Sequence, residues 1–176
     1  MRALSGLALA ALVACSGIGR AEAAETAPVP EAVDPQAVEL LARNMYFEAK
    51  GEGRKGMLAV GWVVLNRMTD GAFPPTVDGV VEEGCQFAWV CEAGPHEPTD
   101  RRAWRQALAL ADKLLSEPPA DPTRGSMWFR RADNDDPGWG GVAPAVRIGN
   151  HLFYAKASRL PRPKPKPADA LSVAQR

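Results

Sequence analysis

Apolar residues recur at helical spacing in several segments of the N-terminal and middle parts of the chain. Asp34 is a good N-cap and is followed by a proline, and Val38, Leu41 and Met45 then lie three or four residues apart. This pattern predicts a helix that ends at a glycine turn. By the same criteria the predicted helices cover Pro35 to about Lys50, Met57–Met68, a short segment over Thr76–Glu83, and Asp100–Ser116.

After Pro122 the pattern changes to short apolar and aromatic runs, which are typical of strands. The dipeptide Gly149-Asn150 separates two of these runs and suits a two-residue hairpin turn with glycine first. The predicted strands are Ser126–Arg130, Ala145–Ile148 and His151–Tyr154. We therefore expect an α+β fold, with helices first and a small antiparallel sheet or hairpin near the C-terminus.

Both ends of the chain differ from this folded segment. Residues 1–23 combine Arg2, an uncharged apolar run and an Ala21-Glu22-Ala23 cleavage site, which predicts a secretory signal peptide. Residues 24–33 read as a flexible leader, residues 34–157 as one catalytic domain, and residues 158–176 as a disordered tail rich in proline and basic residues.

The signal segment leaves two forms of export open. Cleavage after Ala23 would release the protein into the periplasm, whereas Leu12-Val13-Ala14-Cys15 is similar to the lipobox of bacterial lipoproteins. Membrane anchoring is expected only if Cys15 is lipidated. The apolar run is too short for a permanent transmembrane helix.

Composition and charge exclude several classes of protein. The chain has 46% hydrophobic and 24% charged residues, as ordinary globular proteins do, which excludes fibrous and wholly disordered classes. The formal net charge is zero, so the chain lacks the basic excess of nucleic-acid-binding proteins. No nucleic-acid partner is expected, and we expect a monomer.

Two cysteines remain after the signal segment. Cys85 and Cys91 are six residues apart, and an exported protein meets an oxidising environment, so one small disulfide loop is predicted. A functional alternative makes Cys85 the nucleophile of a thiol peptidase, with His151 as its base.

Glu48 is the most unusual candidate for catalysis. It lies three residues after Met45 and so continues the apolar face of the first predicted helix. Burial there would raise its pKa, and a carboxylic acid that is protonated near neutral pH can donate a proton to a glycosidic oxygen. The structural alternative is an ion pair of Glu48 with Arg43, Arg54 or Arg67.

Other chemistries lack their motifs. The chain has two histidines and neither an H-E-x-x-H nor a Cys-x-x-Cys spacing, so no metal site is predicted. It also lacks a Gly-x-Ser-x-Gly elbow and a phosphate-binding loop, and no cofactor is expected.

Four motifs, in order, are similar to the SleB-type cell wall hydrolases, a family related to spore-cortex-lytic enzymes. They are Leu41-Ala-Arg-Asn-Met-Tyr-Phe-Glu-Ala-Lys-Gly-Glu52, the segment Gly56–Arg67 ending Val-Leu-Asn-Arg, Cys85-Gln-Phe-Ala-Trp89, and Ile148-Gly-Asn-His-Leu-Phe-Tyr154. The resemblance covers about residues 36–156 and implies a lysozyme-like domain. It further implies cleavage of peptidoglycan between N-acetylmuramic acid and N-acetylglucosamine, by a lytic transglycosylase or muramidase route.

The resemblance also implies roles for particular residues. Glu48 aligns with the family's catalytic glutamate, which serves as a single general acid and base. Glu52 is expected to support it. The residues expected to contact the glycan strand are Gln86, Phe87, Tyr46, Trp89 and His151. A non-catalytic peptidoglycan-binding module with the same fold is the alternative.

Overall fold

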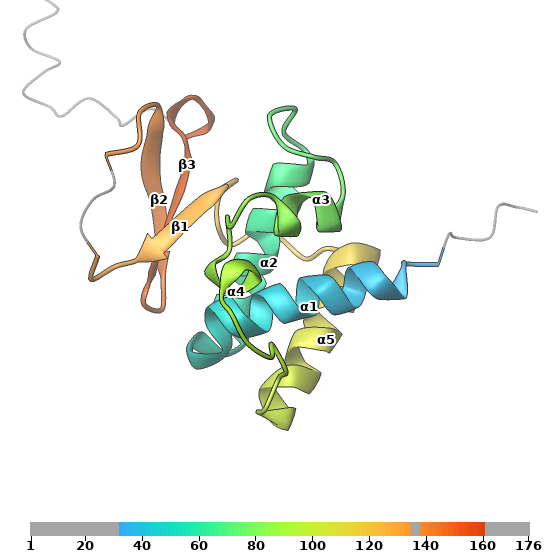
Figure 1. The fold of residues 1–176 in the computed structure, drawn as a ribbon. Helices are drawn as coiled ribbons and strands as arrows, with labels where there is room; N and C mark the ends of the chain where they lie inside the picture. Colours follow the sequence, from blue (N-terminus) through green and yellow to red (C-terminus); the bar gives the residue numbers. More distant parts are fainter. Residues whose placement is uncertain (1–31, 135–137, 161–176) are drawn as a thin grey trace, which may run out of the picture. The chain divides into compact units, whose positions relative to one another are not determined.

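The computed structural model describes residues 32–134 and 138–160. Its elements are α1 (Pro35–Ala49), the 3-10 turn η1 (Lys50–Glu52), α2 (Gly53–Met68), α3 (Val77–Glu82), α4 (Ala88–Cys91), α5 (Arg101–Ser116), β1 (Trp128–Arg131), β2 (Val142–Ile148), β3 (His151–Lys156) and the 3-10 turn η2 (Ala157–Arg159) (Figure 1). Helices precede a small antiparallel sheet, which confirms the predicted α+β class. The predicted signal peptide, the leader up to residue 31 and the tail from residue 161 lie outside the described residues.

The start of α1 follows the predicted signals. An oxygen of Asp34 accepts a hydrogen bond from the Gln36 backbone N–H at 2.9 Å, and Pro35 occupies the first helical position, where it loses no hydrogen bond. At the other end the chain tightens into η1, and α2 begins at Gly53 rather than at the predicted Met57. Arg54 and Lys55 in this first turn are exposed, so apolar spacing could not mark it.

The helical core forms around α2. Val60 and Val64 of this helix are fully buried in one cluster with Leu41 and Met45 of α1 and with residues of α5. A Cβ at Gly61 would overlap Leu114 Cδ1 of α5, so a larger residue there would force the Leu114 side chain to move.

The sheet has the order β1-β3-β2, with both pairs antiparallel. β1 begins two residues after its predicted start and ends one residue later, at Arg131, and β3 continues two residues further, to Lys156. β2 begins at Val142, three residues before its predicted start; the irregularity between Pro144 and Val146 breaks the alternation of side chains on which the prediction depended. The hairpin between β2 and β3 turns at Gly149, whose φ of +58° requires glycine as the sequence predicted.

Apolar packing and hydrogen bonds join the sheet to α2. Ala59 and Val63 of the helix form a second buried cluster with Phe153 of β3. Asn66 Nδ2 donates to the Ser126 carbonyl at 3.0 Å, and Arg67 Nε donates to the Met127 carbonyl at 2.7 Å. These bonds hold the residues that immediately precede β1 against the end of α2.

The fold continues past the predicted domain boundary at residue 157. Ala157–Arg159 forms η2, and both Lys156 and Arg159 pair with Asp70, at 2.7 Å and 2.9 Å. The Lys156 contact is the largest cause that holds the pKa of Asp70 below its usual range. This ion-pair group ties the end of the sheet to the end of α2.

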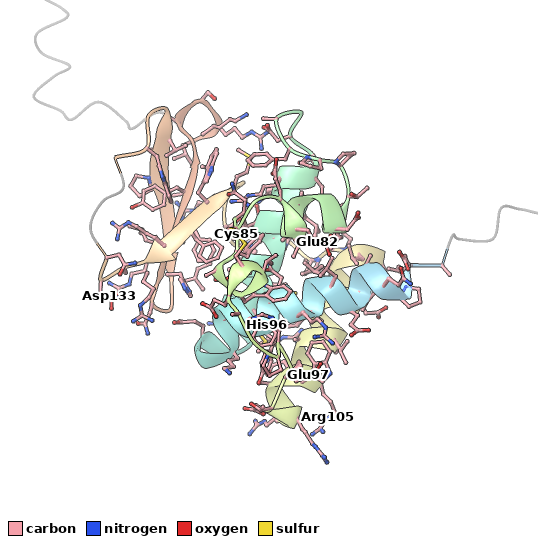
Figure 2. The ribbon with its side chains drawn as sticks, in the orientation of Figure 1. Glu82, Cys85, His96, Glu97, Arg105 and Asp133 are labelled. Atoms are coloured by element: carbon pink, nitrogen blue, oxygen red, sulfur yellow. A yellow bond between two sulfur atoms is a disulfide. The ribbon has the colours of Figure 1, made fainter. Side chains whose placement is uncertain are left out.

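Cys85 and Cys91 form the predicted disulfide, with their Cα atoms 5.4 Å apart (Figure 2). The loop they close contains α4, a short helix that the sequence did not predict because four residues carry no periodic signal. Trp89 of α4 donates from Nε1 to Asn44 Oδ1 at 2.9 Å and stacks on Phe47, so the loop packs on α1. No helix in residues 32–134 and 138–160 is both long and apolar enough for a membrane span.

Candidate active site

A cavity of about 420 Å³ lies where the end of α1, the disulfide loop and the sheet meet. Each of these segments contributes side chains to its wall. The lining residues are Glu48 of α1, Arg67 of α2, Gln86 and Ala88 of the disulfide loop, Trp128, Phe129, Arg130 and Arg131 of β1, Asn134 and Trp139 of the following segment, and His151 of β3.

Glu48 enters this cavity from the last turn of α1, and it is the only carboxyl among the described lining residues. Burial raises its pKa from 4.5 to about 7; the backbone at Ala88 opposes this shift, and the negative charge of Glu92 adds to it. About half of the Glu48 side chains are thus protonated at neutral pH.

The ion pair offered as the structural alternative for Glu48 is absent. Among the described residues, Arg43 pairs with Glu39 at 3.0 Å, and no ion pair includes Glu48. The alternative is therefore wrong for Arg43, Arg54 and Arg67 alike, and a half-buried acid without a cationic partner is a feature of functional sites.

Glu52 is not among the residues that line the cavity, and it contacts the hairpin that carries His151. Its Oε2 accepts a hydrogen bond from the Asn150 backbone N–H at 2.8 Å, at the tip of the β2–β3 hairpin. A Cβ at Gly149 would overlap the same oxygen, so any larger residue there would have to displace the Glu52 carboxylate from the hairpin. The supporting role of Glu52 stays a prediction, and holding the β2–β3 hairpin is the way in which this residue would act.

His151 begins β3 and is only 7% exposed. Burial lowers the pKa of its imidazole, while the charge of Glu52 opposes the shift. The ring is therefore neutral at pH 7, and its buried Nδ1 has no hydrogen-bond partner among the described residues. A neutral imidazole can accept or donate one hydrogen bond to a substrate.

Aromatic side chains form one wall of the cavity. Trp128 and Phe129 come from β1, and Trp139 is 40% exposed, with its ring edge-on to Tyr154 at 5.4 Å. Exposed indole faces in a cavity suit the apolar faces of sugar rings.

The structure brings only some of the predicted glycan-contacting residues together. Gln86 and His151 line the cavity with Glu48, whereas Tyr46, Phe87 and Trp89 do not. Tyr46 is fully buried and its hydroxyl accepts from the Asp100 N–H, and Phe87 is 1% exposed. Trp89 packs on α1. These three residues thus have packing roles in the structure, and their contact with a glycan strand stays a prediction.

Sequence reasoning also missed the arginines of the cavity. Arg130 donates from Nε to the Tyr154 hydroxyl at 2.8 Å and from Nη1 to the Arg131 and Asn134 carbonyls. Arg131 pairs with Asp133 at 2.9 Å. Arg67 was considered only as an ion-pair partner of Glu48, because helical spacing cannot show that a residue on α2 reaches a cavity beside β1.

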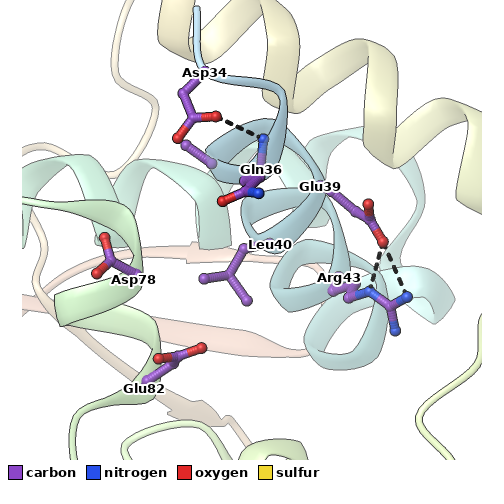
Figure 3. Close-up of a pocket in the computed structure, with 8 residues that line it drawn as sticks. Asp34, Gln36, Glu39, Leu40, Arg43, Asp78 and Glu82 are labelled. Carbon is purple, nitrogen blue, oxygen red and sulfur yellow. Dashed lines mark hydrogen bonds and ion pairs between the residues drawn. The ribbon is translucent and has the colours of Figure 1, made fainter.

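A second hollow, between α1 and α3, has a different character (Figure 3). Its wall carries the carboxyl groups of Asp34, Glu39, Asp78 and Glu82, and Glu39 is paired with Arg43. It contains no aromatic side chain. In the described ranges, no three His, Cys, Asp or Glu side chains are grouped so as to hold a metal ion.

Comparisons with known proteins agree with the motifs noted in the sequence. The Cell Wall Hydrolase family matches residues 51–154, a span that begins after Glu48. The spore cortex-lytic enzyme of Halalkalibacterium halodurans is 33% identical over 126 residues, which cover 71% of this chain and 36% of that enzyme. The cell wall hydrolase CwlJ of Bacillus subtilis is 32% identical over 122 residues, 66% of this chain and 83% of CwlJ. The chain thus spans well under half of the first of these relatives.

Solved structures show the same fold. The catalytic domain of the Bacillus cereus SleB protein superposes with a TM-score of 0.56 at 28% identity, over 71% of this chain and 94% of that domain. The catalytic domain of the germination-specific lytic transglycosylase SleB from Bacillus anthracis gives the same TM-score and identity and is covered to 98%. With more than half of its residues matched by the family and its fold shared with these catalytic domains, the chain belongs to the cell wall hydrolase family.

Proposed function

We propose that this protein cleaves the glycan strand of peptidoglycan between N-acetylmuramic acid and N-acetylglucosamine, with Glu48 as general acid and base. The observation that carries the proposal is the Glu48 carboxyl itself, which lies in an aromatic-walled cavity without a cationic partner and has a pKa of about 7. An acid poised near the working pH is what protonation of a glycosidic oxygen requires. The names of the relatives support the substrate class.

The reaction begins with transfer of the Glu48 proton to the bridging oxygen. The bond from the muramic C1 to this oxygen then breaks, leaving an oxocarbenium-like sugar and the Glu48 carboxylate. In a lytic transglycosylase the carboxylate takes the proton of the muramic 6-hydroxyl, and that oxygen closes on C1 to give a 1,6-anhydro ring. Attack by water instead would give a reducing end, as in a muramidase.

The cavity wall favours the route with one acid. The two-carboxylate mechanisms need a second Asp or Glu on the far side of the bond, and the described lining residues include none besides Glu48. Intramolecular attack by the 6-hydroxyl needs no second carboxylate, because Glu48 performs both proton transfers. Trp128 and Trp139 are placed to hold the sugar rings while this occurs.

Digestion of purified peptidoglycan tests the reaction. We expect the protein to release fragments that end in 1,6-anhydro-muramic acid, which are lighter by one water than the reducing fragments of a muramidase. Mass spectrometry of the soluble products measures this difference directly. Binding of a folded protein to the wall without any release would instead support the non-catalytic wall-binding module.

The pH dependence of the reaction should follow Glu48. Since the first step needs the protonated acid and the pKa is about 7, kcat/KM should fall about tenfold per pH unit above that value. Activity at pH 9 should then be about 100-fold below activity at pH 6, measured by turbidity loss of a peptidoglycan suspension. A fall that already begins near pH 4.5 would mean that Glu48 titrates as an ordinary glutamate.

The cellular setting is part of the proposal. We propose that residues 1–23 direct export and that the domain acts on the wall from the periplasm, either free or anchored through a lipidated Cys15. The mass of the mature protein distinguishes the two forms, because lipidation adds acyl groups to a chain that begins at Cys15.

A further inference from the structure

Arg67 is a buried cation at the wall of the cavity. It is 3% exposed, although it belongs to the lining residues. Its Nε donates to the Met127 carbonyl at 2.7 Å, and its Nη1 is buried without any hydrogen-bond partner in the described part of the chain. No ion pair there includes it. The N–H groups on Nη1 of the guanidinium group therefore have no acceptor in the described part of the chain.

The charge on this side chain persists at neutral pH. Burial lowers the pKa of Arg67 to about 10, which still leaves it protonated at pH 7. The rings of Phe73 and Phe87 lie 5.1 Å and 5.3 Å from the guanidinium carbon and support the cation from within the core. These contacts offset part of the cost of burying a charge. The negative charge of the exposed Glu83 also favours the charged form of Arg67, but the two side chains form no ion pair.

Among the described residues, no carboxylate that lines the cavity pairs with Arg67. Glu48 is partly protonated at neutral pH and forms no ion pair, and the charge of Arg131 is already matched by Asp133. Arg130 adds a further positive charge, with its donors directed to carbonyl and hydroxyl oxygens. The wall is thus electropositive, and an arginine with a free Nη1 is best complemented by a carboxylate.

Resting on the proposed function, we propose that Arg67 binds a carboxylate of the muramic acid unit and so selects glycan strands that carry one beside the bond to be cleaved. Two parts of peptidoglycan provide this chemistry. One is the lactyl group of a muramic acid without its peptide, and the other is the stem peptide, which has several free carboxylates. In either case the carboxylate would give Arg67 Nη1 the hydrogen-bond acceptor that no described residue provides.

A purely structural role for Arg67 makes a different prediction. Its bond to the Met127 carbonyl joins α2 to the approach of β1, and removal of the side chain would destabilise the fold in either case. Loss of stability alone is therefore not informative. Only the carboxylate-binding role makes affinity depend on the charge of the substrate.

The test is a binding measurement with the full chain carrying Glu48→Gln, which removes the proposed acid and preserves the substrate. Two types of soluble, uncrosslinked glycan chain serve as probes: chains with stem peptides, and the same chains after an amidase has removed the peptides. Each type is used unmodified and after carbodiimide and ammonia have converted its carboxylates to amides, which gives four probes. We expect amidation to weaken binding at least about tenfold on one of the two chain types, and that type identifies the source of the carboxylate. Equal affinity before and after amidation on both types overturns the proposal.

Variants of Arg67 assign the effect to this residue. In the same background, Arg67→Met should bind native and amidated chains alike, and Arg67→Lys should recover part of the preference because it keeps the charge but not the fork. Arg105→Met, an exposed change of the same kind on α5, should leave the preference intact (Figure 2). A folded Arg67→Met protein that still prefers native chains overturns the assignment. If Arg67→Met does not fold, Arg67→Lys and the four probes still decide.

Failure of this inference is separable from failure of the proposed function. Cleavage of native and amidated chains at equal rates by the unmodified protein would leave the function standing without the carboxylate site. Absence of binding to all four probes overturns the inference, and the peptidoglycan digestion then shows whether the proposed function fails with it.

Discussion

Glu48→Gln is expected to lower the rate of glycan cleavage by about 10²- to 10⁴-fold, the usual contribution of a general acid and base. Glutamine keeps the size of the side chain and its place at the end of α1, but it has no proton to give to the bridging oxygen. Initial rates of fragment release at pH 6, where Glu48 is mostly protonated, measure the effect.

The same substitution should stabilise the fold, which separates a catalytic loss from an unfolded protein. Because the native state raises the pKa of Glu48, it binds this proton more tightly than the unfolded chain between pH 4.5 and about 7. Stability of the unmodified protein therefore falls as pH rises through this window, and it stays lower above it. Glu48→Gln removes this effect. At pH 8 the free energy of unfolding of the variant should therefore exceed that of the unmodified protein by up to about 3 kcal/mol.

A matched control uses the same helix. Glu39 lies on the exposed side of α1 and pairs with Arg43, so Glu39→Gln should change neither the cleavage rate nor the free energy of unfolding by much. Equal activity of Glu48→Gln and the unmodified protein would remove Glu48 from the mechanism. A fall in both activity and stability at pH 8 would instead point to a structural role.

Local signals account for what the sequence could predict. Asp34 and Pro35 begin α1 through contacts within one turn, and Gly149 alone allows the positive φ of the hairpin. Glu48 could be found because it continues a helical stripe, so its burial follows from spacing. Each of these features depends on residues that are close in the chain.

The remaining features depend on tertiary packing. The residues Gln86, Phe87 and Trp89 of one motif were all predicted to contact the glycan strand, but the sequence could not show that only Gln86 lines the cavity while the other two pack inward. Arg67 and Trp128 reach the cavity only because β1 docks against α2. No periodicity within one element encodes that juxtaposition.

Loss of the disulfide should destabilise the protein and lower its activity together. Closing the short loop between Cys85 and Cys91 restricts the unfolded chain, and chain-entropy arguments assign about 2 kcal/mol to a loop of this size. The loop also holds Gln86 and Ala88 at the cavity, beside Glu48. The double substitution Cys85→Ser with Cys91→Ser should therefore lower the Tm by several degrees and the cleavage rate to a partial extent.

Reduction of the unmodified protein provides the matched comparison. A reductant should shift its Tm and activity to those of the double serine variant and should leave that variant unchanged, because the variant has no bond to reduce. A thiol peptidase makes the opposite prediction, since reduction would free the Cys85 sulfur and increase activity. With Cys85 bonded to Cys91 the sulfur is no nucleophile, and activity that survives in the double variant would assign catalysis to a residue other than cysteine.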